Sequence, residues 1–575
     1  MASDATGGGS DAGLRSGSRA VAAAILLSRL AGLVRERVIA QWLGTGFGAE
    51  AVRAALRIPN LLQNLLGDGV LSAAFVPSYA RLVAEGREEE AGRLAAAVAS
   101  VLLVVTAALA AVGMLLAGPL TRVLVPGFPP GTAKYDLTVQ LVRILAPGAG
   151  VLVLSAWALG VLTAHRRFFR AYVAPVLWNA AIVTAGVAAG LRGLAEADVA
   201  RAVAVGALVG ALLQLAVQLP AVRRHGGARA VRPLRPGASA ALAGVLRAAR
   251  GAVASRGVVQ ISAYLDLAVA SLLAAGAVAA LGYAQVLHLL PVSLFGMSVA
   301  AAALPDLATA GRAAPDLAAD RVRASLRRTT AFALPTAVAY VAVGDHVVGL
   351  LFAGGAFGPA ETRQVAAVLA AYALGLAATT QGRVLQTALH ALDDTRTPAR
   401  VAGLRVLVGT AAGVALMLVL DAWRFDVGGP VQVGPIGPAS TAERAADASL
   451  LRLGAVGLAL GASLGAWVEV GLLRRAVTGR IPLRSARVGW SGPIRTAAVV
   501  GVAALVARGL PAALDLSGRA AAVAVLLPVG LAGLVALRLG GELGGSPIRA
   551  PWGVRRRGRR GGPAGDRRGG PSARG

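Results

Sequence analysis

Long apolar blocks separated by short arginine-rich stretches run through most of this 575-residue sequence. A helix that crosses a bilayer needs about 20 consecutive apolar residues, and blocks of this length recur along the chain. Only 15% of the residues are charged and 56% are hydrophobic, whereas a soluble chain carries about 25% charged residues. The pattern therefore predicts an all-α polytopic membrane protein and excludes a soluble enzyme.

The apolar blocks can be divided into fourteen predicted transmembrane segments. They cover residues 20–43, 51–80, 94–125, 137–164, 171–192, 199–222, 238–273, 276–308, 324–352, 362–390, 398–421, 449–477, 493–509 and 519–540. Several exceed the span length and are expected to tilt or kink. The polar termini, residues 1–18 and the basic tail 549–575, are expected to be disordered, because they contain too little apolar surface to fold.

A faint internal repeat divides the first twelve segments into two lobes. The second segment ends in Val76-Pro77-Ser78 and the eighth in Leu304-Pro305-Asp306, with the two prolines 228 positions apart. Six segments separate the copies, so both have the same orientation in the membrane. We therefore predict an N-lobe at 19–222 and a C-lobe at 238–477, pseudo-symmetric about a central cavity. Residues 493–540 add two C-terminal helices.

The distribution of charge predicts orientation and partners. The formal net charge of +29 suggests nucleic-acid binding, but the arginines concentrate in loops between apolar blocks and in the tail. Counted over alternate loops and the C-terminal tail, basic residues number roughly 33 on one side against 9 on the other, which predicts two cytoplasmic termini. Such loops contact anionic lipids, so we expect anionic membrane lipids and no nucleic acid as partners, and a monomer.

Charged residues inside the predicted segments are candidates for function, because burying a charge in a bilayer is costly. Those singled out are Arg29, Arg35, Glu36, Arg37, Arg53, Arg57, Asp68, Arg143, Asp266, Arg383 and Glu469. Arg37 and Arg53 lie near plausible helix ends and are interpreted as interfacial. The arginines of the first lobe predict a cavity for an anionic substrate. No nucleophile–base pair is found, so no catalytic residue is expected, and the absence of Cys excludes disulfides and thiolate metal sites.

Several motifs, in order between residues 20 and 480, resemble those of the MurJ (MviN) lipid II flippases. They are Ser28–Glu36, Ile58–Leu62, Ala74–Pro77, Ala174–Asn179, Val259–Ser262 and Ala391–Pro398. The resemblance implies the multidrug/oligosaccharidyl-lipid/polysaccharide exporter fold. It also implies alternating access that moves an undecaprenyl-pyrophosphate-linked peptidoglycan precursor across the bacterial cytoplasmic membrane.

The resemblance further implies which residues bind the headgroup. Arg29 and Arg35 match the family's cavity arginines, and Glu36 matches their acidic partner. Two family arginines are replaced here, one by Gln63 and Asn64 in the second segment and the other by Val286 in the eighth, where His288 follows two residues on. We therefore expect Arg29 and Arg35 to carry more of the diphosphate interaction than in relatives, with His288 either adding charge or only packing.

A cation site is also implied by the resemblance, with Na⁺ as a possible coupling ion and no other cofactor. The matching positions are Ser262, Asp266, Asp394, Val406 and Thr410. Oxygen ligands of this kind suit a hard cation, but Asp394 is equally well placed to cap the helix that follows it.

Two alternatives to a lipid II flippase remain open from the sequence. The first is an exporter of the same fold that carries another lipid-linked oligosaccharide or an amphipathic compound. The second is a membrane scaffold that descends from a flippase and no longer transports.

Overall fold

The computed structural model describes residues 8–165, 168–225, 240–297, 299, 314–426, 429–437, 452–483 and 491–540. The first lobe contains α1 (Gly8–Leu43), α2 (Phe47–Leu62), the π-helical η1 (Gln63–Phe75), α3 (Val76–Ala84), α4 (Glu88–Leu115), α5 (Ala117–Leu124), α6 (Ala133–Ala164), α7 (Phe168–Leu191) and α8 (Glu196–His225). The second contains α9 (Ala240–Ser271), α10 (Ala277–Pro291), the π-helical η3 (Val292–Met297), α12 (Pro315–Phe352), α13 (Pro359–Ala373), α14 (Leu376–Ala391), α15 (Arg396–Leu420) and α17 (Gly454–Thr478). Strands β1 (Trp423–Asp426) and β2 (Gly429–Gln432) precede α17, and α18 (Ser491–Ala507), α19 (Leu510–Ala513) and α20 (Gly518–Leu539) end the described chain.

All fourteen predicted segments contain helix in the described part of the chain, which confirms the all-α polytopic fold. Ten described helices are long and apolar enough to cross a membrane, and the bent pair α13–α14 would make eleven. The other three predicted spans lie in α1, α2–η1 and α9, and each of them carries charged residues in its interior. The count of fourteen therefore stays a prediction. The three charged spans all contribute residues to the cavity described below.

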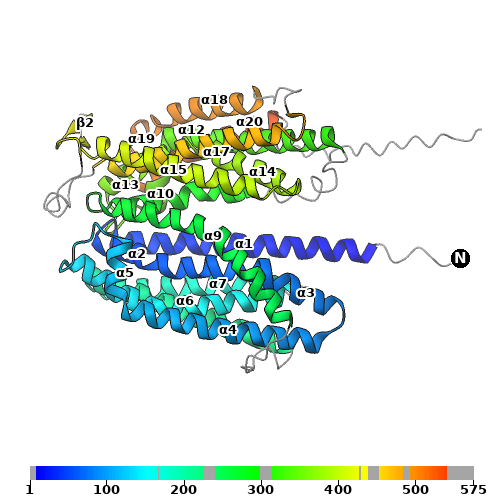
Figure 1. Cartoon of the computed structure of the whole chain (residues 1–575). Coiled ribbons are helices and arrows are strands. Elements are labelled where there is room, and N and C mark those ends of the chain that lie inside the picture. Colours follow the sequence, from blue (N-terminus) through cyan, green and yellow to red (C-terminus); the bar gives the residue numbers. More distant parts are fainter. Residues whose placement is uncertain are drawn as a thin grey trace, which may run out of the picture.

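The two lobes lie side by side, with α1 running between them (Figure 1). The helices α2 and α10 meet across the interface through residues that the repeat relates. Glu50 accepts a hydrogen bond from the backbone N–H of Val278 at 3.1 Å, and Arg57 donates to Gln285 at 3.4 Å. Both pairs are 228 positions apart, the same offset as the two prolines. A residue that touches its own repeat copy lies on the pseudo-two-fold axis, so this axis passes between α2 and α10.

Glycine allows the last two helices of each lobe to cross at backbone distance. In α8, a Cβ at Gly210 would lie 2.8 Å from the carbonyl oxygen of Trp178 in α7. In α17, a Cβ at Gly461 would overlap the backbone of Gly413 in α15. Small residues at four-residue spacing drive helix association where no hydrophobic effect operates. These crossings therefore fix how the last two helices of each lobe pack against one another.

Apart from the start of α9, the described residues of the two lobes share a buried core at one end of the molecule only. There, Leu43 of α1, Tyr283 of α10 and Phe352 of α12 belong to one continuous cluster that includes residues of both lobes. Elsewhere the N-lobe has a core around Trp157, which the start of α9 joins through Leu242 and Val245, and the C-lobe has a core around Leu389. We call the joined end, where α1 terminates, the closed end.

Hydrogen bonds between the lobes reinforce the closed end. The Tyr283 hydroxyl donates to the carbonyl oxygen of Gly44 at 2.8 Å, and the Ala356 N–H donates to that of Gln41 at 2.8 Å. The carboxylate of Glu50, only 1% exposed, also accepts from Lys134 at 2.8 Å. The lobes are therefore held together by packing and by polar contacts at this end.

Three details differ from the sequence-based expectations. First, α1 begins at Gly8 instead of near residue 19, because extending an existing helix costs little once it has nucleated. Second, between the predicted segments 398–421 and 449–477, where the sequence predicted no element, the structure contains an antiparallel hairpin that pairs Trp423 with Gln432. Third, the first half of α9 packs against η1 of the N-lobe, so this helix connects the lobes instead of belonging wholly to the second. The predicted basic tail, 549–575, lies outside the described residues.

Candidate substrate cavity

A cavity of about 610 Å³ lies between the lobes. Helices α1 and α2 form one wall, and α9, α10, α14, α15 and α17 form most of the other. Its charged lining residues are Arg35, Glu36, Arg53, Arg57, Asp266, Arg383 and Arg405. Five guanidinium groups against two carboxylates give the lining an excess of positive charge, which predicts an anionic ligand.

On the N-lobe wall, one carboxylate holds two arginines. Glu36 is 4% exposed and pairs with Arg35 at 2.7 Å and Arg53 at 2.8 Å. Arg35 also donates to the Asn179 side chain at 3.1 Å, while Arg53 lies over the ring of Tyr283, 4.0 Å from its centroid. These donors are committed to the protein, so the trio forms a rigid part of the wall.

The C-lobe wall contains a second buried carboxylate. Glu469 of α17, 2% exposed, pairs with Arg405 of α15 at 2.9 Å and accepts a hydrogen bond from Gln386 of α14 at 2.7 Å. Glu469 thereby connects α17 to both α14 and α15 beside the cavity. The glycine-mediated crossing of α15 and α17 brings Arg405 within reach of Glu469.

Arg57 and Arg383 differ from the other cavity arginines. In the described part of the chain, each makes one hydrogen bond to a neutral amide oxygen, Arg57 to Gln285 at 3.4 Å and Arg383 to Gln386 at 3.5 Å, and neither has a carboxylate within ion-pair distance. These contacts lie beyond the usual range of 2.7–3.2 Å. The two guanidinium groups therefore keep donors available for a ligand.

The structure brings only part of the predicted headgroup site together. Arg35 and Glu36 line the cavity. Arg29 is exposed on α1 and is not among the lining residues, so the expectation that it shares the headgroup with Arg35 does not match the geometry. It lies on the N-terminal side of the cavity wall, nearly two helical turns before Arg35.

The remaining predicted headgroup residues also lie off the cavity. Gln63 and Asn64 are in the π-helical η1, beyond the lining part of α2. His288 is buried against Tyr372, with ring centroids 5.3 Å apart, and its Nδ1 has no hydrogen-bond partner among the described residues. The structure therefore favours a packing role for His288, since its ring does not reach the cavity.

The predicted cation site is not assembled in the described residues. Asp266, Val406 and Thr410 line the cavity. Asp394 does not: it accepts a hydrogen bond from the Thr397 N–H at 2.9 Å and pairs with Arg480. Thr410 lies 16 residues further along, which in a continuous helix is about 24 Å. The side chain of Ser262 is outside the described residues.

Asp394 instead caps α15. The hydrogen bonds from Thr397, and then the charge of Arg480, lower the pKa of Asp394, as expected for a carboxylate at a helix N-terminus. Without Asp394, and beside several arginines, the described donors do not fit a sodium site, so we derive no step through a coupling ion.

Sequence reasoning missed two of the cavity arginines and underused two others. From the sequence alone, Arg53 is interpreted as interfacial and Arg405 is not singled out; Arg57 is included only among the first-lobe arginines, and Arg383 is given no role of its own. One available signal was the spacing of Arg53 and Arg57, which lie four residues apart and therefore share a helix face. The other was Glu469, an acid in a predicted span that requires a cationic partner.

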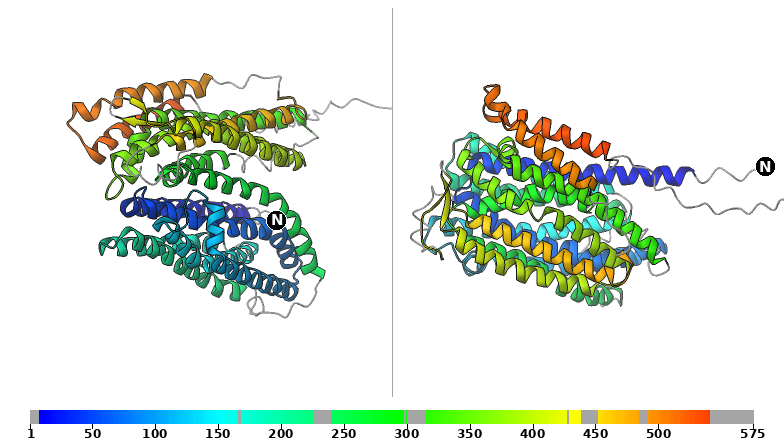
Figure 2. Two further views of the ribbon diagram at one scale, coloured as in Figure 1. Left: turned by 60° about the vertical axis from the view of Figure 1, so that its left-hand side comes forward. Right: turned by 90° about the horizontal axis from the view of Figure 1, so that it is seen from above.

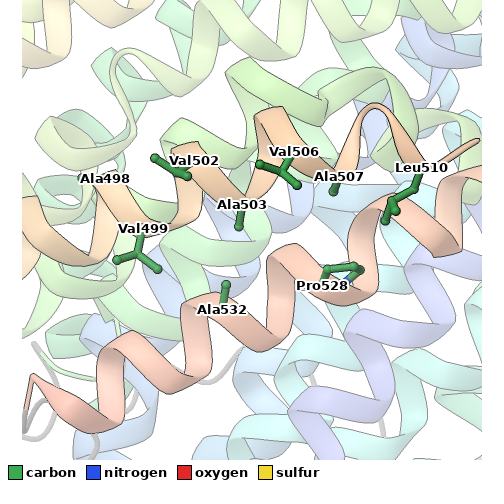
Figure 3. Close-up of a pocket in the computed structure, with 9 residues that line it drawn as sticks. All are labelled: Ala498, Val499, Val502, Ala503, Val506, Ala507, Leu510, Pro528 and Ala532. Carbon is green, nitrogen blue, oxygen red and sulfur yellow. The ribbon is translucent and has the colours of Figure 1, made fainter. Parts of the chain in front are cut away.

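A second hollow lies between α18 and α20, the C-terminal hairpin that packs on the outside of the bundle against α12 (Figure 2). This groove, of about 600 Å³, is lined by Ala498, Val499, Val502, Ala503, Val506, Ala507, Leu510, Pro528 and Ala532 (Figure 3). Every lining side chain is apolar, so the groove suits a hydrocarbon chain and cannot bind a charged headgroup. The chemistry of a polar ligand therefore belongs to the central cavity.

Two solved structures share the fold of this chain. A structure described as lipid II flippase MurJ in an inward closed conformation matches with a TM-score of 0.69 over 91% of this chain and 98% of that chain, at 20% identity. An inward-facing multidrug resistance MATE family transporter of the MOP superfamily matches with a TM-score of 0.63 over 80% of this chain and 96% of that one, at 15% identity. The chain thus has the two-lobed helical fold that these two structures share.

Sequence comparison identifies the family. The model of the family described as lipid II flippase MurJ matches residues 39–428. A probable lipid II flippase MurJ of Rhizobium tropici is 33% identical over 70% of this chain and 75% of its own length. The lipid II flippase MurJ of Burkholderia cenocepacia is 32% identical over 66% of this chain and 73% of its own. The chain belongs to the MurJ family.

Proposed function

We propose that this protein flips lipid II, the undecaprenyl-diphosphate-linked peptidoglycan precursor, from the inner to the outer leaflet of the bacterial cytoplasmic membrane. The observation that carries the proposal is the arginine-lined cavity between two lobes that share a core at one end. A diphosphate that leaves water needs charged partners, and the guanidinium group matches phosphate oxygens and stays charged at any relevant pH. The headgroup would occupy the cavity while the lipid tail stays in the bilayer.

Alternating access requires the closed end to open. With the orientation predicted from loop charge, the closed end faces away from the cytoplasm, so the cavity would load from the cytoplasmic side. Release would break the lobe-to-lobe bonds of Gly44, Glu50 and Ala356. Arginine-rich cytoplasmic loops would contact anionic lipids, and the chain would act as a monomer.

The orientation yields a direct prediction, because the chain has no Cys. In single-cysteine variants, an impermeant maleimide added to intact cells should label Leu194→Cys, between α7 and α8, and should not label Glu85→Cys, between α3 and α4. Both sites are exposed. Permeabilised cells serve as the control, since both cysteines should then react. The reverse labelling pattern would overturn the topology.

The function itself is tested in a strain depleted of its own lipid II flippase. The full chain should restore growth, and the purified protein should bind lipid II. An exporter with a different lipid-linked cargo would restore neither, but would bind its own lipid diphosphate. A scaffold would bind no lipid diphosphate at all. Failure of both growth rescue and lipid II binding would reject the proposed function.

A further inference from the structure

The pairing of charges divides the five cavity arginines into two groups. Arg35, Arg53 and Arg405 hold carboxylates of Glu36 or Glu469 at 2.7–2.9 Å. The Nε atoms of Arg35 and Arg53 are also buried inside the wall. A ligand that used these three groups would have to displace a buried carboxylate, at a cost that the ligand's own contacts must repay.

A ligand that binds Arg57 or Arg383 does not have to displace a hydrogen-bonded carboxylate. Arg57 has no guanidinium nitrogen that is both buried and unbonded, so its free donors face open space, and Arg383 is exposed to the cavity. Among the described residues their guanidinium groups hydrogen-bond only to neutral glutamines, and the carboxylates whose charge they feel, Asp266 for Arg57 and Glu469 for Arg383, lie beyond ion-pair distance. Incoming phosphate oxygens would thus meet two guanidinium groups that lose nothing but a weak amide contact.

Each of the two glutamines holds its arginine in place. The Nε2 of Gln386 donates to Glu469 at 2.7 Å, which fixes the amide so that its oxygen faces Arg383. Gln285 presents its oxygen to Arg57 from the opposite side of the pseudo-two-fold axis. Because an amide orients a guanidinium without neutralising it, both arginines are positioned while their charge stays available.

The two arginines come from different lobes, Arg57 from α2 and Arg383 from α14. We propose that Arg57 and Arg383 form a clamp in which each guanidinium binds one phosphate group of a lipid diphosphate, with Gln285 and Gln386 as positioning residues. The inference rests on the proposed function, which it deepens by naming the binding residues. A diphosphate held in this way connects the lobes, so its binding favours the arrangement in which both arginines line one cavity.

Asp266 provides a second test, in which the expected change in diphosphate affinity has the opposite sign. This carboxylate of α9 is exposed on the cavity; no described residue lies within ion-pair distance of it, but its charge interacts with those of Arg57 and Arg405. Its negative charge opposes an incoming anion in the same space. Removing that charge should therefore strengthen diphosphate binding, whereas removing either clamp charge should weaken it. A merely structural role for these residues would not give opposite signs.

The test measures binding of undecaprenyl diphosphate and undecaprenyl monophosphate to the purified full-length chain. The parent should prefer the diphosphate. Arg57→Gln and Arg383→Gln should each lower diphosphate affinity at least about 10-fold, as expected for losing one charged contact, and should bring the two affinities close together. Asp266→Asn should raise diphosphate affinity. Arg247→Gln, an exposed arginine of α9 away from the cavity, is the matched control and should leave the preference unchanged.

Two further variants keep the test informative if Arg57→Gln or Arg383→Gln fails to fold. Arg57→Lys keeps the charge but loses the fork, and Gln285→Leu removes only the positioning contact, so both should reduce the preference by less than Arg57→Gln does. An unchanged preference in both Arg57→Gln and Arg383→Gln would overturn the clamp. A parent that prefers the diphosphate but does not bind lipid II or rescue growth would instead overturn the proposed function, leaving the clamp intact.

Discussion

Replacing Glu36 with Gln should destabilise the folded protein by about 3–5 kcal/mol, the usual cost of removing one partner from a buried ion pair. The carboxylate bridges Arg35 and Arg53, whose side chains are only 18% and 13% exposed. Gln can satisfy one of the two guanidinium groups but compensates neither charge. The expected result is a lower unfolding temperature in detergent, and loss of growth rescue in the flippase-depleted strain.

The control is an ion pair that makes no such bridge. Glu90 pairs with Arg87 at 2.6 Å on the surface, where both side chains are about half exposed. Exposed pairs contribute little to stability, so Glu90→Gln should leave the unfolding temperature unchanged. Equal shifts for Glu36→Gln and Glu90→Gln would show that the carboxylate bridge does not hold the cavity wall together.

The second large effect is expected at Gly461, where Gly461→Val should prevent the chain from folding. The Cβ would meet the backbone of Gly413, which cannot rotate away as a side chain could. The helices α15 and α17 would have to separate, and with them Arg405 and Glu469, which are 2.9 Å apart. A monodisperse peak in detergent size-exclusion chromatography should therefore be lost.

Gly471 of the same helix provides the matched control. A Cβ at Gly471 would meet nothing within 4 Å, and Ala is favoured over Gly inside a helix by about 0.5–1 kcal/mol. Gly471→Ala should leave the protein folded and slightly more stable. If Gly461→Val gave the same monodisperse protein as Gly471→Ala, the close crossing of α15 and α17 would not be required for folding.

The sequence predicted the helices well because the bilayer constrains them so strongly. The apolar blocks placed a helix in every expected span, and the proline pair 228 positions apart predicted the offset at which Arg57 and Gln285 meet. Span boundaries were less accurate where helices run beyond the apolar block, as at Gly8 in α1. The hairpin after α15 was missed because four-residue strands leave almost no periodic signal.

The sequence predicted a cavity for an anionic ligand but only some of the residues that line it. The sequence indicates how far along its helix Arg53 lies, which led to the interfacial interpretation. It does not indicate which side of the helix faces the other helices, and in the structure Arg53 lies beside Glu36. The motif around Asp394 allowed either a cation ligand or a helix cap, and in the structure its carboxylate accepts a hydrogen bond from the first turn of α15. Which arginines are free depends on contacts between distant helices, such as Arg405 with Glu469, and no local pattern encodes them.

The axis between α2 and α10 has a consequence for how such a chain arose. After a gene duplication, a residue on the axis of symmetry would face an identical copy of itself. Two facing arginines would repel each other, and two facing glutamates would do the same, so an axial position cannot keep a charge in both halves. Arg57 facing Gln285, and Glu50 facing the backbone of Val278, are the arrangement that this constraint requires. The two halves therefore had to diverge in sequence before a charge could be placed on this axis. As a consequence, the ligand site is inherently asymmetric between the two lobes.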